Sequence, residues 1–422
     1  NLIIVVNDNE MSIAENHGGL YQNLKELRDT EGRSSCNFFR SLGLDYLYVG
    51  EGNDIPSLVA AFAKVKDTSR PTVVHIHTQK GKGYAPAEAD REEFHWEMPF
   101  DLETGKPKVD CSGMEDYHSL TGKFLLEKMK EDHTVVAISS GTPTVIGFTP
   151  ERRKQAGRQF VDVGIAEEHA VALASGIAAG GGRPVYGVYS TFIQRCYDQL
   201  SQDLCINGNP AVITVFMGTV AGMNDVTHLG FFDIPLISNI PNMVYLAPTC
   251  SEEYFAMLEW AVRQTEYPVA IRVPGAAVVH RKEEFDTDYS ELNRYKMTAR
   301  GETVAILALG SFYDLGQALK NKLREESGVE ATLINPRYIT GLDEPMLEEL
   351  KVGHRIVVTL EDGVLDGGFG EKIARYYGNS EMRVLNYGLR KEFADRYNLD
   401  ELMKANRLTD KQMAEDIAGI LE

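Results

Sequence analysis

Short apolar runs alternate with amphipathic runs along most of the chain. The apolar runs are rich in β-branched residues and have the length of strands. Amphipathic runs such as 56–65, 119–131 and 251–264 separate them and suit helices. This alternation predicts the α/β class, with mostly parallel sheets. The strand candidates are 72–78, 134–140, 184–189, 211–217, 243–248 and 269–273.

Two polar, strand-poor stretches interrupt this pattern, at 88–116 and 280–302. They separate three α/β units, and the third unit repeats the alternation with further apolar runs. The strand candidates of the third unit are 303–309, 329–336, 355–361 and 382–388.

The opening run "NLIIVV" suits a fully buried parallel strand. No run precedes it to pair with it, and the sequence has no initiating Met. We therefore expect this numbering to begin inside a domain.

Bulk composition narrows the class of protein. A length of 422 residues predicts two or three domains. The formal net charge of -19 argues against nucleic-acid or anionic-membrane binding. The five cysteines form no CxxC pair, which is expected of a reduced cytosolic protein, and no run approaches the roughly 20 apolar residues of a membrane span.

Polar residues follow two of the strand candidates in the first unit. Asn7, Asp8 and Asn9 come directly after the opening strand, where their oxygens suit Mg²⁺ or form an Asx-rich turn. The segment "QKGKGY" follows 72–78 and presents Lys80 beside flexible glycines, which suits an anion.

A different signal lies in "DVGIAEEHAVALASGIAAGG", residues 162–181. Two glutamates, Glu167 and Glu168, open a helix that is otherwise apolar. Carboxylates at a helix start are commonly favoured by the helix dipole alone.

Five sequence motifs occur in this order along the chain: "NDNEMSIAEN", "HTQKGKGYAPAE", "DVGIAEEHAV", "VYSTFIQRCYDQL" and "THLGFFDI". Together they resemble the 1-deoxy-D-xylulose 5-phosphate synthase family, thiamine-diphosphate enzymes of the transketolase superfamily. The resemblance implies three doubly wound α/β domains: part of a diphosphate-binding domain at 1–112, a pyrimidine-binding domain at 113–290 and a C-terminal transketolase-like domain at 295–422. The family's upstream "GDG" metal-binding motif and early catalytic histidine are absent from this sequence.

The resemblance assigns Glu167 as the catalytic glutamate that hydrogen-bonds a ring nitrogen of the cofactor's aminopyrimidine. Phe192 would stack on the pyrimidine, although core packing is the commoner fate of a lone aromatic residue. Arg195 would lie beside Phe192 and close to Tyr189, and Ile165 would contribute a backbone contact.

In the first unit the resemblance assigns Asn9 as a side-chain ligand of Mg²⁺ and Met11 as a carbonyl ligand. Lys80 would lie near the diphosphate. His95 and His228 match active-site histidines of the family, and the alternative for each is a structural histidine.

Three departures concern the substrate. Two arginines of the family that hold the acceptor's phosphate are replaced by Met217 and Gly275, and an aspartate is replaced by Asn224. Each charge-assisted hydrogen bond contributes roughly 1.5–3 kcal/mol, so the usual acceptor is in doubt. Arg272 matches an earlier arginine of the same motif, and the resemblance assigns it no phosphate.

We therefore predict a carboligase that depends on thiamine diphosphate and Mg²⁺ and joins a two-carbon unit from pyruvate to an aldehyde. A cytoplasmic homodimer with its active site between domains is expected, with small-molecule substrates and neither nucleic acid nor membrane as a partner. Two alternatives stay open. One is a transketolase that transfers a ketol unit between sugars, and the other is a non-catalytic or split-enzyme subunit.

Overall fold

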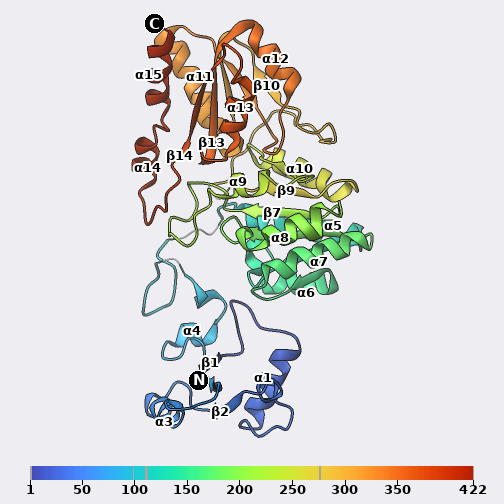
Figure 1. Ribbon diagram of the computed structural model, residues 1–422, viewed down its shortest axis with the longest axis vertical. Helices are drawn as coiled ribbons and strands as arrows, with labels where there is room; N and C mark the ends of the chain where they lie inside the picture. Colours follow the sequence, from blue (N-terminus) through green and yellow to red (C-terminus); the bar gives the residue numbers. More distant parts are fainter. Residues whose placement is uncertain (1, 98, 110–112, 275–276, 422) are drawn as a thin grey trace. The chain divides into compact units, whose positions relative to one another are not determined.

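The computed structural model describes residues 2–97, 99–109, 113–274 and 277–421. The chain folds into two compact units, Asn1–Met114 and Glu115–Glu422 (Figure 1). Parallel sheets with helices dominate both units, so the predicted α/β class is confirmed.

The first unit contains a parallel sheet of three strands in the order β1-β3-β2. Successive side chains of the central strand point to opposite faces, as the two-residue period of a strand requires. Val73 packs with Leu27 of α1 on one face, while Val74 packs with Val65 of α3 on the other. The elements of this unit are β1 (Ile3–Asp8), α1 (Gly19–Asp29), α2 (Phe38–Ser41), β2 (Asp45–Val49), α3 (Ile55–Val65), β3 (Thr72–His77), α4 (Ala85–Ala89) and the 3₁₀ turn η1 (Glu93–His95).

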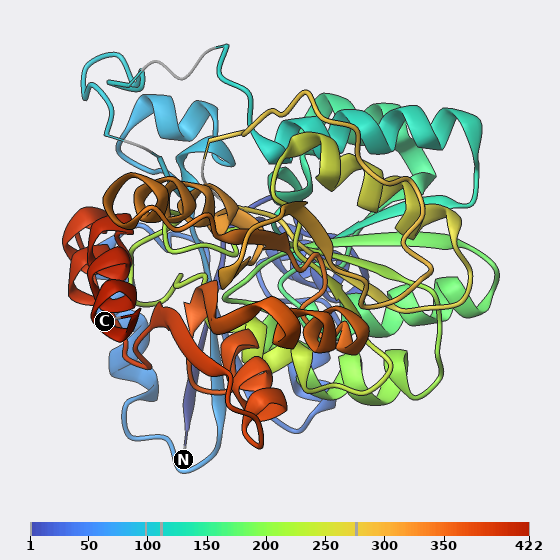
Figure 2. The ribbon, with the colours of Figure 1, turned by 90° about the horizontal axis from the view of Figure 1, so that it is seen from above.

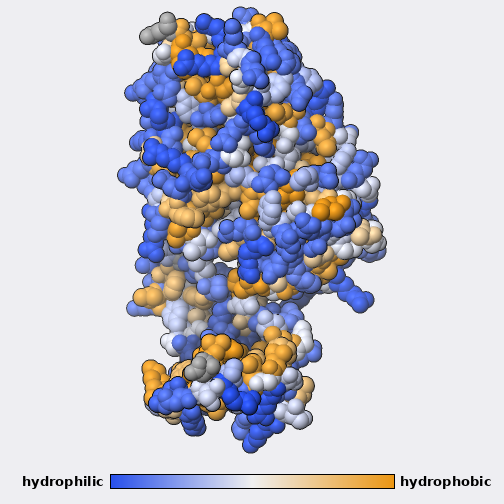
Figure 3. Space-filling model, viewed as in Figure 1, coloured by the Kyte–Doolittle hydropathy of each residue, from blue (hydrophilic) through white to orange (hydrophobic). Residues whose placement is uncertain are grey.

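Strand β1 is parallel, as predicted, but the prediction that it is fully buried is wrong. Val5 is 46% exposed, and Asp8 is the strand's buried residue. The reason is that β1 pairs with β3 alone among the described strands and so lies at a sheet edge. Figure 3 shows hydrophobic residues on the surface of this unit, whose exposed apolar side chains include Leu42, Ile55 and Val59.

The second unit begins with a parallel sheet of six strands in the order β5-β4-β6-β7-β9-β8. Its central strands are continuous apolar runs because helices cover both faces of such a sheet. Strands β6 and β7 end at residues 189 and 216, and the candidate site forms around these ends. The elements are α5 (Tyr117–Glu131), β4 (Val135–Ser139), α6 (Pro150–Ala156), β5 (Phe160–Asp162), α7 (Glu167–Ala179), β6 (Arg183–Tyr189), α8 (Tyr197–Gln199), β7 (Val212–Phe216), α9 (Asp233–Ser238), β8 (Val244–Leu246), α10 (Ser251–Arg263) and β9 (Val269–Arg272).

A second sheet of this unit has five strands in the order β10-β12-β11-β13-β14, and β10 pairs antiparallel with β12. Helix α15 packs along α11 beside this sheet (Figure 2). The elements are β10 (Lys296–Ala299), β11 (Thr303–Ala308), α11 (Tyr313–Ser327), β12 (Thr332–Asn335), α12 (Glu344–Gly353), β13 (His354–Val364), α13 (Phe369–Tyr377), β14 (Arg383–Leu389), α14 (Leu399–Ala405) and α15 (Asp410–Leu421).

One hydrophobic cluster joins the two sheets of the second unit. It contains Ile213 and Tyr245 from the six-stranded sheet together with Ile334 and Val357 from the five-stranded sheet. The predicted second and third domains therefore share a core, while the three-domain division itself stays a prediction. Among the described helices, none combines the length and apolar character that a bilayer crossing requires.

Candidate functional site

A tight turn delivers the first residue of α7 to the carboxyl ends of the sheet. The Asp162 carboxylate accepts hydrogen bonds from the backbone N–H groups of Gly141 and Gly164, both at 2.8 Å. Gly164 has a φ of 73°, which glycine adopts without strain. Helix α7 then begins at Glu167, so this carboxylate lies in the first turn, where the helix dipole stabilises negative charge.

Glu167 is buried and incompletely satisfied. It is 3% exposed, and its Oε2 accepts no hydrogen bond in the described part of the chain. Arg195 Nη1 lies 3.2 Å from this oxygen as an ion-pair partner, but without the geometry of a hydrogen bond. A buried acceptor without a donor is costly, and in native structures such an atom commonly has a catalytic role or binds a water or an ion. The atom therefore fits a heterocyclic nitrogen that donates a hydrogen bond.

Besides the charged Arg195 and Glu168, two groups near Glu167, Cys196 and Tyr186, remain neutral. Burial raises the pKa of the Cys196 thiol to about 12, and the charges of Glu167 and Glu168 add to this effect. Burial likewise raises the pKa of Tyr186 well above its ordinary value, and its hydroxyl lies 2.9 Å from Ser140 Oγ. The uncharged side chains of Cys196 and Tyr186 therefore lie near the Glu167 carboxylate.

A row of aromatic rings follows the end of β6. The ring of Tyr189 lies 6.1 Å from that of Phe192, and Phe192 lies 5.4 Å from His228 in an edge-on contact. Phe192 also packs against the core, and its role in stacking on a ligand stays a prediction. Ile165, in the turn before α7, is 53% exposed and leaves an apolar side chain uncovered.

His228 is held by its own loop. Its Nδ1 lies 2.8 Å from Thr227 Oγ1, and the Thr227 carbonyl accepts a hydrogen bond of 3.0 Å from Thr191 Oγ1. This links the His228 loop to the segment that carries Phe192. The structure thus brings together five of the predicted residues, namely Glu167, Tyr189, Phe192, Arg195 and His228.

Arg272 is engaged inside the second unit. It is 4% exposed, and its Nε and Nη2 donate to the Asp233 carboxylate at 2.7 and 3.1 Å. Its Nη2 also donates to the carbonyls of Gly230 and Asp362. This arginine is therefore structural, and the sequence analysis missed its partner because Asp233 lies 39 residues away.

Met217 and Gly275 occupy the two positions where the resemblance predicts phosphate-binding arginines. Met217 follows β7 with a φ of 58°, an uncommon conformation for a residue with a side chain. It is half-buried against the core. Gly275 lies outside the described residues.

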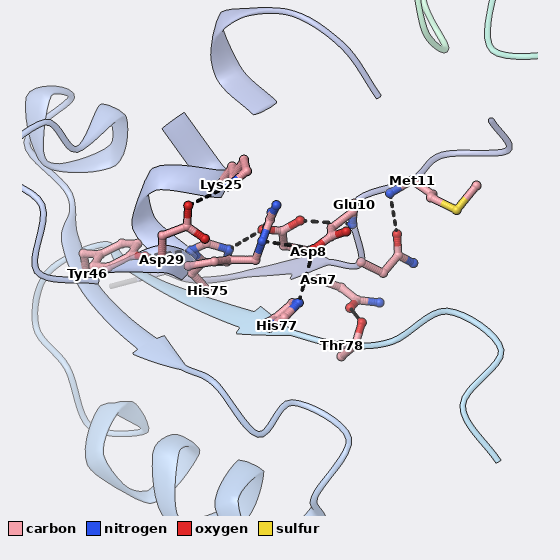
Figure 4. A network of polar contacts seen from close by, with 12 residues as sticks. Asn7, Asp8, Glu10, Met11, Lys25, Asp29, Tyr46, His75, His77 and Thr78 are labelled. Atoms are coloured by element: carbon pink, nitrogen blue, oxygen red, sulfur yellow. Dashed lines mark hydrogen bonds and ion pairs between the residues drawn. The ribbon is translucent and has the colours of Figure 1, made fainter. Parts of the chain in front are cut away.

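In the first unit, Asp8 anchors the turn that carries Asn9 and Met11. Asp8 Oδ2 accepts hydrogen bonds from Arg28 Nη1 at 2.5 Å and from His75 Nε2 at 2.8 Å (Figure 4). Burial alone would raise the pKa of Asp8, but the hydrogen bonds from His75 and Arg28 lower it to about 2. Because a carboxylate only accepts, the other nitrogen of His75 is left to accept from the Tyr46 hydroxyl at 2.7 Å.

The predicted cation-binding turn is built largely from internal hydrogen bonds. Asn9 Oδ1 accepts from the Met11 N–H at 3.1 Å, and Asn7 Oδ1 accepts from Thr78 Oγ1 at 2.6 Å (Figure 4). Asp8 is thus committed to the fold, whereas the amide oxygens of Asn7 and Asn9 each accept one of these hydrogen bonds and keep a second lone pair. Among the described residues, no three His, Cys, Asp or Glu side chains group as a metal site.

Lys80 reaches the same turn. Its Nζ donates to the carbonyls of Ser12 and Ile13 at 2.7 and 3.3 Å, and partial burial lowers its pKa. The exposed His95 has a lowered pKa because of partial desolvation and the nearby charge of Lys80. Four of the predicted residues, Asn9, Met11, Lys80 and His95, therefore belong to one neighbourhood of the first unit.

Comparison with known proteins assigns the chain to a family. Residues 115–278 match the family described as "Transketolase, pyrimidine binding domain", residues 294–413 match "Transketolase, C-terminal domain", and residues 1–37 match "1-deoxy-D-xylulose-5-phosphate synthase". The 1-deoxy-D-xylulose-5-phosphate synthase of Clostridium beijerinckii is 33% identical over 96% of this chain and 71% of that protein. The synthase of Clostridium acetobutylicum is 32% identical over 100% of this chain and 72% of its own length. The chain belongs to the 1-deoxy-D-xylulose-5-phosphate synthase family.

Solved structures place this synthase-family chain among transketolase folds. A protein titled "Split gene transketolase, inactive beta4 tetramer" matches with a TM-score of 0.60 and 21% identity over 71% of this chain and 96% of that chain. A transketolase variant of Pichia stipitis in complex with fructose 6-phosphate also matches with a TM-score of 0.60, at 15% identity over 99% of this chain and 71% of that one. At these identities the likeness concerns the fold.

Proposed function

We propose that this protein is a transferase that depends on thiamine diphosphate and Mg²⁺, takes a two-carbon unit from a 2-oxo acid, pyruvate, and joins it to an aldehyde. One observation carries the proposal: the buried Glu167 Oε2, at the start of α7, has no hydrogen-bond donor among the residues that the structure describes. Membership of the synthase family supports the same reaction class.

The residues around Glu167 would hold the pyrimidine end of the cofactor. Glu167 would accept a hydrogen bond from a ring nitrogen and share its proton, and Phe192 would pack against the ring. Ile165, in the turn before α7, would contribute a backbone contact to the ring. Arg195, half-exposed beside Glu167, would orient that carboxylate. When bound, the cofactor would supply the electron sink for loss of CO₂ and formation of the new carbon–carbon bond.

The first unit would hold the diphosphate end. Asn9 Oδ1 and the Met11 carbonyl would bind Mg²⁺, because amide and carbonyl oxygens suit this hard cation. Lys80 would stabilise the turn and add positive charge beside the diphosphate. His95 and His228 would act on the substrate by donating or accepting protons, which imidazole can do near neutral pH.

The kind of aldehyde acceptor can be proposed from the positive charges that could bind a phosphate group. The relatives' name specifies a 5-phosphate product. Here Met217 replaces one phosphate arginine of the family, and Arg272 is fully engaged with Asp233 and two carbonyls. We therefore favour an aldehyde that is less phosphorylated than glyceraldehyde 3-phosphate, with 1-deoxy-D-xylulose 5-phosphate synthesis as the competing outcome.

We further propose that the protein is a cytoplasmic homodimer and that each chain has three domains, at 1–112, 113–290 and 295–422. Its substrates are small molecules. The pyrimidine-binding and C-terminal family matches, at 115–278 and 294–413, support the second and third domains.

Calorimetric titration of the full chain with thiamine diphosphate and Mg²⁺ tests the cofactor directly. The proposal expects saturable binding that needs both components. Pyruvate-dependent release of CO₂ then separates the proposed reaction from ketol transfer between sugar phosphates, which would mark a transketolase. Absence of binding would favour the non-catalytic alternative.

A further inference from the structure

Residues 219–228, here named the His228 loop, have little regular structure of their own. The loop joins the end of β7 to the segment before α9, and it places His228 against Phe192. Loops of this kind need outside contacts to hold one conformation, because each ordered residue loses backbone entropy. The contacts of this loop come largely from the C-terminal part of the same unit.

Three consecutive residues, Asp395–Tyr397, form hydrogen bonds with the loop, and we name them the latch segment. The Tyr397 hydroxyl donates to the Val220 carbonyl at 2.7 Å and lies 3.4 Å from the Met223 carbonyl. Asp395 Oδ1 accepts from the Val226 N–H at 3.3 Å. Hydrogen bonds from the latch segment thus reach both ends of the loop.

Asn224 forms the centre of this contact. Its Nδ2 donates to the Tyr397 carbonyl at 3.0 Å, while its own carbonyl accepts from the Arg396 N–H at 2.7 Å. Arg396 has a φ of 47°, a left-handed conformation that a non-glycine residue keeps only where its surroundings impose it. The reciprocal pair of bonds provides that constraint.

The identity of residue 224 matters because the donor is a side-chain amide. A carboxylate accepts hydrogen bonds and does not donate them, so an aspartate here would face the Tyr397 carbonyl with two acceptors opposed. An ionised aspartate at this position would therefore be incompatible with this contact. The side-chain amide of Asn224 gives the loop its central hydrogen bond to the latch segment.

A buried bond secures the N-terminal end of the same loop. Asp362, at the end of β13, accepts the Val220 N–H at 2.7 Å and the Ser311 hydroxyl at 2.6 Å. Its backbone carbonyl accepts from Arg272. The five-stranded sheet therefore holds the loop through β13 as well as through the latch segment.

We infer that the latch segment positions His228 for the reaction, with Asn224 and Tyr397 as positioning residues that do not touch the substrate. The inference rests on the proposed function for its kinetic consequence alone. The hydrogen bonds that define the latch belong to the folded chain, with or without activity.

Hydrogen exchange of the full chain tests the latch without any substrate. Tyr397→Phe removes the hydroxyl that bonds Val220 and Met223, and Asn224→Asp removes the central donor. Each variant is expected to speed amide exchange in residues 219–228 by about tenfold, which corresponds to the loss of a hydrogen bond. Tyr376→Phe is the matched control, because its hydroxyl bonds Glu348 in the α12–α13 region. Unchanged exchange in both latch variants would overturn the inference.

Kinetics then test the positioning of His228. For the latch variants we expect kcat for carboligation to fall several-fold while thiamine-diphosphate affinity stays within twofold of the wild type. When His228→Gln is already present, adding either latch substitution should no longer lower kcat for carboligation. Faster loop exchange with wild-type kcat would contradict the positioning role. A wild-type protein without activity would defeat the proposed function, and the exchange experiment would still decide the latch.

Discussion

Arg195 lies between the carboxylates of Glu167 and Glu168, with its Nη1 3.2 Å from Glu167 Oε2 and its Nη2 3.8 Å from Glu168 Oε1. One guanidinium thus faces two carboxylates in the first turn of α7. The Glu167 side chain is buried, whereas that of Glu168 is 44% exposed, although one oxygen of each carboxylate, Oε2, is buried without a hydrogen-bond partner among the described residues. Under the proposed function, Glu167 would accept a donor from outside the chain.

The Arg272–Asp233 ion pair is expected to support stability and to have no direct role in phosphate binding. Breaking a buried pair leaves an uncompensated charge and costs about 3–5 kcal/mol. Arg272→Leu should lower the free energy of unfolding by that amount in urea titrations. Arg407→Leu is the control, because the Arg407–Asp416 pair is substantially exposed and solvent screening makes such pairs contribute little to stability. Equal effects of the two substitutions would contradict the structural assignment.

Replacing Met217 with arginine should improve the use of a phosphorylated aldehyde. The substitution returns a guanidinium to the end of β7, where a charge-assisted hydrogen bond to phosphate contributes roughly 1.5–3 kcal/mol. We expect the KM for glyceraldehyde 3-phosphate to fall by about tenfold relative to the wild type. Met217→Gln, neutral and of similar size, should leave the KM unchanged. An equal KM in Met217→Arg and the wild type would show that residue 217 does not face the acceptor.

Acid should weaken the first unit through Asp8. The pKa of this carboxyl is about 2 in the folded chain against 3.8 ordinarily, so its contribution is present above about pH 4 and is lost as the pH falls toward 2. The contribution is on the order of 2 kcal/mol. Asp8→Asn should reduce protection from hydrogen exchange in β1 and β3 at pH 7, and the difference from the wild type should shrink on acidification.

The exposed Asp67, 83% accessible at its side chain, supplies the control substitution for that experiment. Asp67→Asn should follow the wild-type pH dependence throughout. A difference between Asp8→Asn and the wild type that persists undiminished at pH 2 would refute the role of the ionised carboxylate.

Hydrophobic pattern predicted the strands that lie inside the sheets. Strands β3, β6, β7, β9, β11 and β13 are continuous apolar runs because both faces of a parallel sheet are covered. Strand β2 was missed because it is a half-buried edge strand whose Asp45 and tyrosines weaken the apolar signal. Strand β10 was missed in a polar stretch for the same reason, since it is an antiparallel edge strand.

Local motifs predicted the residues of the candidate site, but their partners needed the tertiary structure. Glu167 stands out in sequence as a carboxylate opening an apolar helix, whereas its missing hydrogen-bond donor is visible only in the fold. His75 could have been suspected because it is a polar residue inside the buried central strand 72–77, but its bond to Asp8 spans 67 residues. The contact between Asn224 and Tyr397 spans 173 residues and has no local signal at all.

The most direct test of the account compares pyruvate decarboxylation by Glu167→Gln and Glu168→Gln at saturating thiamine diphosphate and Mg²⁺. Glutamine keeps the size of Glu167 but cannot share a proton with the cofactor's ring. Removing a group that takes part in proton transfer typically costs 10²–10⁴-fold in rate, so we expect kcat of Glu167→Gln to fall at least about 100-fold while calorimetry shows retained cofactor binding. Glu168→Gln should keep most of its turnover. Near-normal turnover by Glu167→Gln would contradict the central claim.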